Sequence, residues 1–454
     1  MGRVTLEQAA AWCGGRIDPK YAHVVFYGAN IDSRNVEPGQ LFVALQGARD
    51  GHDFIPMALE KGAAAVLCTH CDGDYPAIVV EDTRLAMGDI ARGHRQQLGI
   101  KVVGITGSVG KSTTKEMIAS VLSSTFRTGR SPVNHNNDLG LPMSVLALPE
   151  DTEVAVLEMG MNHFREIAYL TGIAKPDVAV IINIGTMHIE HLGSQEGILK
   201  AKMEILEGVP ENGTLILNGD DPLLWGAGKQ SNVQTTYFGV SNSEAQVLGS
   251  EVTEGAGQLC YNVQCEDVGF RVVLPLEGNH FVSDSLAAVS VGLAMGVTPE
   301  KIAESLAGFQ NMAGRQEILQ AGEYTIIKDC YNAGPESMAA ALSVLGNKPG
   351  RHVAVLGDML ELGVRAQAEH YRIGRIAAEK ADLVLAYGPN SSRVISGALT
   401  GGMPDSRAKS FEDREELVVT LKRLAKPGDV ILFKGSHGMH MELALEKFLK
   451  DDET

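Results

Sequence analysis

The chain has 454 residues, of which 44% are hydrophobic and 21% charged, and its formal net charge is −17. A chain of this length has room for about three domains of ordinary size, and its acidic balance argues against nucleic acid as a partner, because phosphate backbones are bound by a surplus of Lys and Arg. It contains no apolar run of the roughly 18 residues that a membrane span needs and no unbroken apolar core of a signal peptide near its start, so we expect a cytoplasmic protein without a membrane span.

The first part of the chain alternates short helices and strands. A helix is expected over residues 5–15, where Gly14 and Gly15 end it, and a longer helix over residues 83–99 leads into the next unit. A strand, a helix and two further strands are expected between them, over residues 40–45, 53–63, 63–68 and 76–82. This pattern predicts a small α/β domain over residues 1–98.

From Lys101 onward the chain reads as strands of Val, Ile and Ala separated by helices. This pattern is typical of a parallel sheet that is covered by helices on both faces. We therefore expect a central domain over residues 99–312, of the phosphate-loop type, with a mostly parallel sheet. Its predicted strands cover residues 101–106, 153–160 and 176–185, and its predicted helices cover residues 111–124, 164–172, 194–208, 282–296 and 299–309.

The rest of the chain repeats the alternation of strands and helices. We predict a doubly wound, Rossmann-like C-terminal domain over residues 313–454. Its expected strands cover residues 324–332, 352–359, 382–388 and 429–436, and the expected helices between and after them include residues 335–346, 370–381 and 413–425. The fold class is therefore α/β, with three domains.

A phosphate-binding loop is predicted after the first strand of the central domain, where the sequence reads GITGSVGKSTTKE. Lys111 can reach the β- and γ-phosphates of a nucleotide, and Ser112 can ligate Mg²⁺. The strict pattern has a glycine where this chain has Ile105, but the strand before the loop and the helix after it favour ATP or GTP binding. The predicted nucleotide-binding residues of the loop are Thr106, Gly107, Ser108, Val109, Gly110, Lys111, Ser112 and Thr113.

Two other strand ends are expected at the same edge of the sheet. One ends in Glu158, and the next delivers His188 and His191 a few residues past its end. An acid and an imidazole near Ser112 suit a divalent metal, although either histidine taken alone is more often a surface residue.

Two lysines follow on the next predicted helix. Lys200 and Lys202 are two residues apart and so cannot share a helix face, and a solvated helix is the default interpretation of this stretch. A lysine has the wrong charge for a metal site, and it becomes a ligand only if its amine is carbamylated.

The chain as a whole resembles the Mur ligases of peptidoglycan synthesis. The resemblance rests on motifs whose order and spacing agree over nearly the whole length, although most of them are weak when taken singly. In chain order they read DSRNVEPGQLFVALQGARDGHDF, GITGSVGKSTTKE, NHNNDLGLPMS, LEMGMNHFREI, INIGTMHIEHLGS, KAKMEI, DCYNAGPESM, VLGDMLELG and KGSHGM. The loop of this family has the form G-x-x-G-K-[ST] and is entered by a Thr, as at Thr106.

The resemblance implies an ATP-dependent amide ligase that activates a carboxylate as an acyl phosphate. The expected substrates are UDP-N-acetylmuramoyl-tripeptide and D-alanyl-D-alanine, and the expected cofactors are ATP and two Mg²⁺ ions. By resemblance, Lys111 and Ser112 hold the ATP phosphates and Mg²⁺, and Glu158 and His188 bring metal ions. Lys202 matches the carbamylated lysine of the family, which implies that Lys111, Glu158, His188 and Lys202 are the catalytic residues. A monomer is expected.

Further residues are assigned to ligands by the same resemblance. They are the UDP-sugar residues Ser33, Arg34 and His52, the muramyl-facing residues Asn134, Asn136 and Asn137, the nucleotide-contacting residues Arg315 and Asp329, and the residues Tyr331, Asn332 and Lys434, which face ATP and the dipeptide once the C-terminal domain closes. The alternative for the first six is structural: a turn formed by Asp-Ser-Arg, a buried histidine and an Asn-rich turn.

One segment departs from the family pattern. The chain reads GNHFVSDSLAA, so Phe281 and Asp284 stand where the family usually has asparagines. The second of these positions is expected to contact the nucleotide base. An ionised Asp284 can accept a hydrogen bond from the adenine amino group, but it cannot donate one as an amide does.

Two alternative functions share part of this sequence pattern. A sibling ligase that adds a diamino acid, or glutamates to folate, would share the central domain, but YNAGPESM and VLGDMLELG favour the members that add the dipeptide. A phosphate-loop switch or binding module would predict a guanine-reading N-K-x-D motif, whereas Asn347 and Lys348 continue into Pro-Gly. Whether the tripeptide ends in lysine or diaminopimelate is left open by the sequence.

Overall fold

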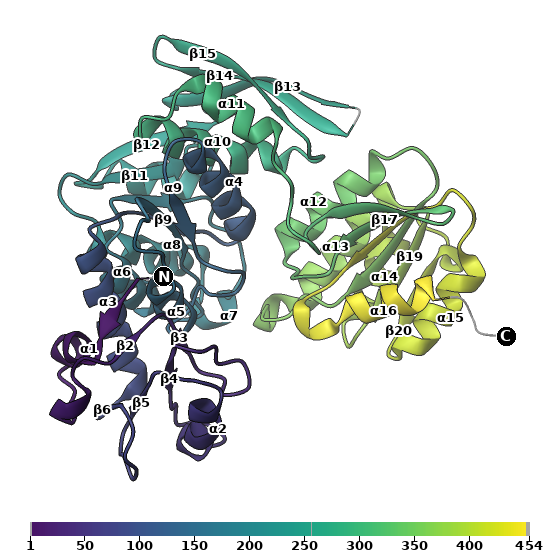
Figure 1. Ribbon diagram of the computed structural model, residues 1–454. Coiled ribbons are helices and arrows are strands. Elements are labelled where there is room, and N and C mark those ends of the chain that lie inside the picture. The colour runs from purple at the N-terminus through teal and green to yellow at the C-terminus, as the bar shows by residue number, and fades with distance from the viewer. Residues whose placement is uncertain (1, 256, 451–454) are drawn as a thin grey trace.

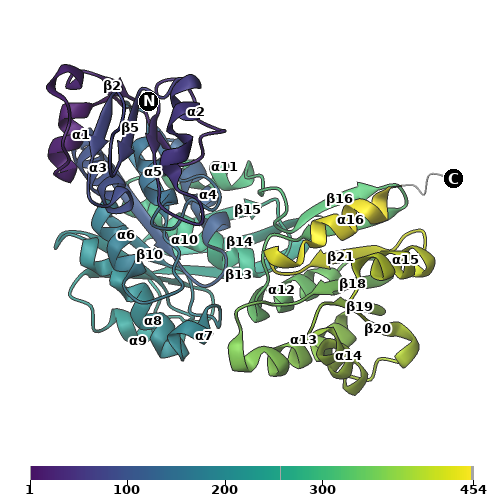
Figure 2. The same ribbon diagram turned by 90° about the horizontal axis from the view of Figure 1, so that it is seen from below.

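The computed structural model describes residues 2–255 and 257–450. Three lobes, each with its own sheet, follow one another along the chain (Figure 1). Seen from below, the C-terminal lobe stands apart from the other two, and the N-terminal lobe partly overlaps the central one (Figure 2). The predicted limits of the three domains, at residues 98/99 and 312/313, stay predictions, and their outermost residues, 1 and 454, lie outside the described residues.

The N-terminal lobe contains a four-stranded sheet in the order β3-β4-β5-β6, with every neighbouring pair parallel. Its first helix begins at a capping box formed by Thr5 and Gln8 and ends where Gly14 adopts the left-handed conformation, with φ 65°. Both ends agree with the prediction. The elements are β1 (Val4–Thr5), α1 (Leu6–Cys13), β2 (Val25–Phe26), β3 (Ala29–Asn30), β4 (Leu41–Val43), α2 (Ile55–Glu60), β5 (Ala65–Cys68), β6 (Ala77–Val79) and α3 (Thr83–Leu98).

The central lobe is built on a nine-stranded sheet in the order β15-β14-β13-β12-β11-β10-β7-β9-β8. Every neighbouring pair from β8 to β13 is parallel, and the pairs β13-β14 and β14-β15 are antiparallel, which confirms a mostly parallel sheet. The strands are β7 (Lys101–Thr106), β8 (Thr128–Arg130), β9 (Val154–Glu158), β10 (Val178–Ile181), β11 (Thr214–Asn218), β12 (Gln234–Gly239), β13 (Val247–Gly255), β14 (Gln258–Cys265) and β15 (Val268–Leu274).

Helices cover both faces of this sheet because successive strand residues point to opposite sides. On β9, Ala155 and Leu157 enter one hydrophobic core, while Val154 and Val156 enter the other. The helices are α4 (Lys111–Ser123), α5 (Gly140–Leu146), α6 (Glu166–Ala174), α7 (Ile189–Leu192), α8 (Gln195–Met203), α9 (Pro222–Gly228), α10 (His280–Ala294) and α11 (Pro299–Ala307).

Two of the predicted helices of the central domain have limits in the structure at which Glu204 lies or makes contact. The helix expected over 194–208 ends as α8 at Met203 and continues as a 3-10 turn, Glu204–Gly208. The helix expected over 164–172 begins only at Glu166, because Arg165 is left-handed with φ 73°. The Glu204 carboxylate accepts hydrogen bonds from the backbone N–H groups of Arg165 and Ala168, so it caps α6 from outside that helix.

The C-terminal lobe has a six-stranded sheet in the order β16-β17-β21-β18-β19-β20, parallel except for β16. This confirms a doubly wound α/β arrangement, in which the chain runs from β17 through β18 and β19 to β20 and then returns to place β21 between β17 and β18. The elements are β16 (Glu317–Ala321), β17 (Tyr324–Asp329), α12 (Pro335–Gly346), β18 (His352–Gly357), α13 (Ala366–Lys380), β19 (Leu383–Tyr387), α14 (Ser391–Thr400), β20 (Ala408–Phe411), α15 (Arg414–Leu424), β21 (Val430–Lys434) and α16 (Met441–Leu449).

None of the helices in the described part of the chain combines the length and the apolar character that crossing a bilayer requires.

Candidate active site

The phosphate loop, residues 106–113, connects β7 to α4 at the edge of the central sheet. Ile105 is fully buried within β7, paired with Glu158 of β9 and Val180 of β10. Ile105, which stands where the strict pattern has a glycine, is therefore still part of the strand and not of the loop. Gly110 adopts φ 82°, and a side chain there would meet Asp284 Oδ1 at 2.6 Å. Glycine is thus required where the chain turns into α4.

Asn183, just after β10, fixes the shape of this loop. Its Oδ1 accepts hydrogen bonds from the backbone N–H groups of Ser108 and Val109, each at 3.0 Å, and its Nδ2 donates to Val109 O. The sequence analysis missed this residue, because its role depends on the pairing of β7 with β10. The free N–H groups at the start of α4 remain to bind an anion, since the first N–H groups of a helix have no partner within it.

Two lysines converge on one carbonyl of the loop. Lys111 Nζ donates to Gly107 O at 2.9 Å, and Lys202 Nζ donates to the same oxygen at 2.8 Å. Lys202 is only 2% exposed, and its burial, followed by the charge of Lys111, holds its pKa well below the usual value for a lysine. Lys200 instead lies over the Phe164 ring. The structure therefore brings Lys202 to the loop and not Lys200.

Ser112, Glu158 and Asn136 form a chain of hydrogen bonds at the end of β9. Ser112 Oγ donates to Glu158 Oε2 at 2.7 Å, and Asn136 Nδ2 donates to Glu158 Oε1 at 2.8 Å. Glu158 is 2% exposed. The hydroxyl of Ser112 and the buried carboxylate of Glu158, which are far apart in the sequence, thus meet beside the phosphate loop. Both groups offer the hard oxygen donors that Mg²⁺ prefers.

His188 lies at the start of α7 in the left-handed conformation, with φ 63°. Burial lowers its pKa to about 4, and the nearby charges of Lys111 and Lys202 act in the same direction. The imidazole is therefore neutral at physiological pH and can act as a ligand. Its Nδ1 lies 2.7 Å from Glu361 Oε2 of the C-terminal domain, without the alignment of a hydrogen bond. The other candidate, His191, packs against His163, with the ring centres 4.6 Å apart and the ring planes tilted by 39°.

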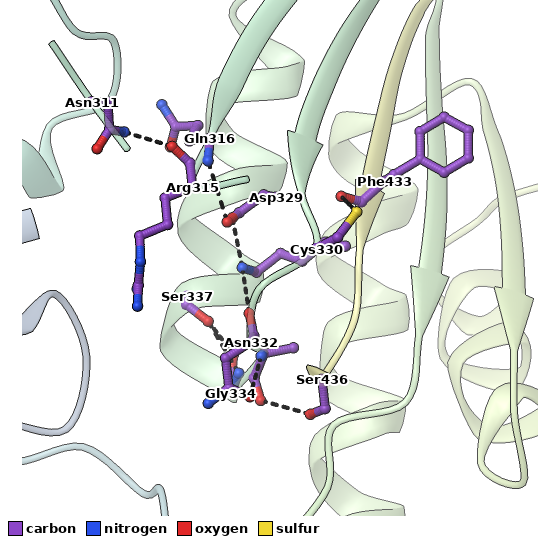
Figure 3. Close-up of polar contacts among 12 residues, drawn as sticks. Asn311, Arg315, Gln316, Asp329, Cys330, Asn332, Gly334, Ser337, Phe433 and Ser436 are labelled. Carbon is purple, nitrogen blue, oxygen red and sulfur yellow. Dashed lines mark hydrogen bonds and ion pairs between the residues drawn. The ribbon is translucent and has the colours of Figure 1, made fainter. Parts of the chain in front are cut away.

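The C-terminal domain supplies the facing wall. Figure 3 shows the Arg315 side chain extended away from the C-terminal sheet. It reaches Ser112, to whose Oγ its Nη2 donates at 2.9 Å, and its guanidinium lies 3.9 Å from the centre of the Tyr331 ring. Lys434 Nζ is bonded to Asp329 Oδ2 at 2.6 Å and to Asn332 O at 3.1 Å. The two domains therefore meet directly at Ser112.

The central and C-terminal domains together line an open cavity of about 520 Å³. Most of the predicted site residues line it. Thr106 and Gly107 belong to the phosphate loop but do not line the cavity, and neither does Lys202, which donates to Gly107 O. The lining includes Ser108, Val109, Gly110, Lys111, Ser112, Thr113, Asn134, Asn136, Asn137, Glu158, His188, Asp284, Arg315, Asp329, Tyr331, Asn332 and Lys434. Glu336 also lines it and was missed by sequence analysis; its Oε1 accepts a hydrogen bond from Thr186 across the domain boundary at 3.0 Å.

The segment that departs from the family pattern also lines the cavity. Asp284 is 6% exposed, and burial raises its pKa to about 7. Near that pH a substantial fraction of the carboxyl is protonated, so it can donate a hydrogen bond much as an amide does. Asp284 therefore lacks a hydrogen to donate only when it is ionised. Phe281 is buried, with its ring centre 4.0 Å from that of His280.

The predicted UDP-sugar residues lie in the N-terminal domain and do not line this cavity. Ser33 is buried with its Oγ 3.4 Å from Met57 Sδ, and the exposed Arg34 is paired with Asp32. His52 is held at both ring nitrogens, by Asp50 at 2.6 Å and by the N–H of Thr69 at 3.0 Å. Their assignment to a ligand stays a prediction.

The side chains beside the phosphate loop offer few ligands for a divalent cation. In the part of the chain that the structure describes, no three His, Cys, Asp or Glu side chains gather closely enough to form a metal site by themselves. Mg²⁺, however, is usually bound through one or two carboxylates plus substrate phosphates. Ser112 and Glu158 fit that mode, because both face the cavity at the phosphate loop.

Three family models match the chain in order. They are described as the Mur ligase family, catalytic domain, over residues 25–95, the Mur ligase middle domain, over residues 105–292, and the Mur ligase, glutamate ligase domain, over residues 314–437.

Full-length relatives agree with this result. The chain is 39% identical to the UDP-N-acetylmuramoyl-tripeptide--D-alanyl-D-alanine ligase of Bacillus subtilis, with 94% of each chain covered. A crystal structure of MurF from Acinetobacter baumannii superposes with a TM-score of 0.91 at 33% identity and 99% coverage of both chains. A MurF ligase from Thermotoga maritima in complex with ADP superposes with a TM-score of 0.83 at 30% identity, covering 93% of this chain and 97% of that one.

Proposed function

The chain belongs to the Mur ligase family, and from this premise we propose that it joins D-alanyl-D-alanine to the terminal carboxylate of UDP-N-acetylmuramoyl-tripeptide, with ATP converted to ADP and phosphate. The observation that carries the proposal is the contact between Ser112 and Glu158 at a phosphate loop, in a chain whose full-length relatives bear that name.

In the first step a carboxylate oxygen of the tripeptide attacks the γ-phosphorus of ATP. The new P–O bond gives an acyl phosphate, and the bond to the bridging oxygen breaks with release of ADP. This step brings anions together, so it depends on positioning and on nearby positive charge. Lys111 and Arg315 supply that charge, from the loop on one side of the cavity and from the C-terminal domain on the other.

In the second step the amine of D-alanyl-D-alanine attacks the acyl carbon. A C–N bond forms, the nitrogen loses a proton to solvent, and the tetrahedral intermediate collapses as the C–O bond to phosphate breaks. The phosphate that leaves carries one oxygen from the original carboxylate. Contacts across the domain boundary, such as Thr186 with Glu336, would help to exclude the water that otherwise hydrolyses the acyl phosphate.

Two Mg²⁺ ions would neutralise charge on the phosphoryl oxygens when bound. Ser112 and Glu158 are proposed to hold the first ion, and His188 with a carbamylated Lys202 the second. Carbamylation needs a neutral amine, which adds to CO₂ to form an N–C bond and releases one proton. The buried position of Lys202 favours that neutral form.

The remaining assignments are part of the same proposal. Ser33, Arg34 and His52 would serve the UDP-sugar in the N-terminal domain, Asn134, Asn136 and Asn137 the muramyl group, and Tyr331, Asn332 and Lys434 the dipeptide and ATP. Asp284, Arg315 and Asp329 would contact the nucleotide. A cytoplasmic location is proposed, because both ATP and a UDP-linked precursor are cytoplasmic substrates, and the monomer stays part of the proposal.

The test is a matrix of substrates with phosphate release as the readout. The acceptors are UDP-N-acetylmuramoyl-tripeptides ending in lysine or in diaminopimelate, and the amines are D-alanyl-D-alanine, D-alanine and L-glutamate. We expect ATP-dependent phosphate release only when one of the tripeptides and D-alanyl-D-alanine are both present. Release that needs no acceptor, or that responds to glutamate instead, would contradict the proposal.

A further inference from the structure

Lys115 is a fully buried lysine that no step of the proposed reaction uses. It lies on α4 one turn beyond Lys111, with 0% exposure, and it does not line the cavity. Its Nζ donates to Ser131 O at 2.6 Å and lies 3.1 Å from Glu116 Oε1. An unpaired buried ammonium is costly, so these two contacts account for its presence in the core.

Ser131, the partner of Lys115, lies just after β8 and is itself fully buried. Its N–H donates to Val156 O at 3.0 Å, which extends the pairing of β8 with β9 by one residue. Its Oγ accepts the N–H of Glu158 at 3.1 Å. Ser131 therefore fixes the backbone of Glu158 on one side and is held by the ammonium of Lys115 on the other.

The segment that follows Ser131 returns to Glu158 a second time. Asn136 Nδ2 donates to Glu158 Oε1, and Asn136 O accepts the N–H of Gly160 at 2.7 Å. The carboxylate of Glu158 is thus oriented by the loop of residues 132–137, and its backbone is oriented by Ser131. Ser131, whose carbonyl oxygen accepts from Lys115, makes the first of these contacts itself, and the loop that makes the second begins directly after it.

We propose that Lys115 is a positioning residue: its ammonium fixes Ser131, and through Ser131 it sets the position of Glu158 and of the asparagine loop, residues 132–137. Lys115 acts without touching substrate. The inference rests on the proposed role of Glu158 toward a divalent cation. A displacement of Glu158 by a fraction of an ångström weakens cation binding and slows phosphoryl transfer, because both depend on position.

The test compares Lys115→Met with Lys101→Met, a matched control on β7 whose exposed ammonium pairs with Asp177 at 3.0 Å. Binding of Mn²⁺ in the presence of a non-hydrolysable ATP analogue, followed by electron paramagnetic resonance, is the readout that does not need turnover. We expect Lys115→Met to raise the Mn²⁺ dissociation constant about 10-fold and to lower kcat about 10- to 100-fold, with the KM for ATP changed less than about 3-fold. Lys101→Met should match the wild type in all three.

Ser131→Ala gives a second route to the same answer, and it keeps the inference testable if Lys115→Met does not fold. Removing the hydroxyl frees the N–H of Glu158, so this variant should also weaken Mn²⁺ binding. In the double variant the two effects should be clearly less than multiplicative, because both act on the same support. Multiplicative effects, or a Lys115→Met enzyme whose folded fraction binds Mn²⁺ as tightly as the wild type, would overturn the inference.

These outcomes are separable from failure of the proposed function. If the wild type binds Mn²⁺ with the ATP analogue but releases no phosphate with the two proposed substrates, the substrate assignment fails and the role of Lys115 is still decided by the binding data. If the wild type turns over normally and Lys115→Met is unaffected in both assays, only the role of Lys115 fails.

Discussion

The hydroxyl of Ser112 donates to Oε2 of Glu158 at 2.7 Å, although 46 residues separate the two in the chain. Ser112 belongs to the first turn of α4, and Glu158 is the last residue of β9. They meet because β7 and β9 are parallel neighbours whose carboxyl ends share one edge of the sheet. This contact makes the phosphate loop and the buried carboxylate one site.

Replacing Glu158 by Gln should remove the negative charge while nearly preserving the shape of the side chain. We expect kcat to fall about 100-fold or more, because the cation loses its carboxylate ligand, and higher Mg²⁺ should restore part of the loss. Steady-state kinetics at several Mg²⁺ concentrations check this. Glu153→Gln, just before the start of β9, is the control and should behave as the wild type; equal activity of both variants would remove Glu158 from the metal site.

Replacing Lys202 by Ala should abolish turnover, whereas Lys200→Ala on the same helix should leave kcat within about 2-fold of the wild type. The reason is position: Lys202 reaches Gly107 O, while Lys200 lies over an exposed ring. A small carboxylic acid added at high concentration should partly restore activity to Lys202→Ala by replacing the missing anionic ligand. Full activity of Lys202→Ala without any acid would exclude the ligand role.

Asp284 makes folding stability depend on pH. Burial raises its pKa to about 7 from the ordinary value of 3.8, so the folded protein keeps a proton that the unfolded chain releases. Stability from this group is therefore greatest below about pH 4 and falls as the pH rises to about 7, at up to about 1.4 kcal/mol for each pH unit of that window.

Asp284→Asn should remove this loss. Its Tm should exceed that of the wild type at pH 8, and the difference should shrink steadily as the pH is lowered toward 4. Thermal unfolding of both proteins over this range is the measurement. A Tm difference that stays constant with pH would show that the carboxyl of Asp284 does not carry the effect.

Binding of nucleotide and substrates should bring the C-terminal domain closer to the central one. The two already meet through Arg315 and Ser112, and through Thr186 and Glu336, and a triphosphate in the cavity would add positive partners from both sides. Small-angle scattering should show a smaller radius of gyration with the ATP analogue and UDP-N-acetylmuramoyl-tripeptide than without them. An unchanged scattering curve would argue against closure.

Contiguous features of the site could be predicted from the sequence, and features that depend on sheet pairing could not. The phosphate loop is a local pattern between a strand and a helix, so Lys111 and Ser112 were identified directly. The roles of Asn183 and Ser131 depend on which strands become neighbours. Glu204 was read as part of a helix, but its carboxylate caps another one.

The sequence pattern alone does not decide between Lys200 and Lys202. Helical spacing establishes that the two point in different directions, but only the packing of α8 decides which of them is buried. The resemblance to the Mur ligases selected Lys202, and the structure places that side chain at the loop. For Arg34 and His52 the local partners Asp32 and Asp50 satisfy the side chains, so their part in ligand binding rests on the resemblance alone.

In the proposed reaction the enzyme activates a peptide carboxylate as an acyl phosphate. The most direct measurement labels the terminal carboxylate of UDP-N-acetylmuramoyl-tripeptide with ¹⁸O and follows the released phosphate by ³¹P NMR in the presence of ATP and D-alanyl-D-alanine. Each phosphate released by ligation should carry one ¹⁸O atom when both oxygens of that carboxylate are labelled. Phosphate without label, formed at the same rate as the amide product, would contradict this mechanism.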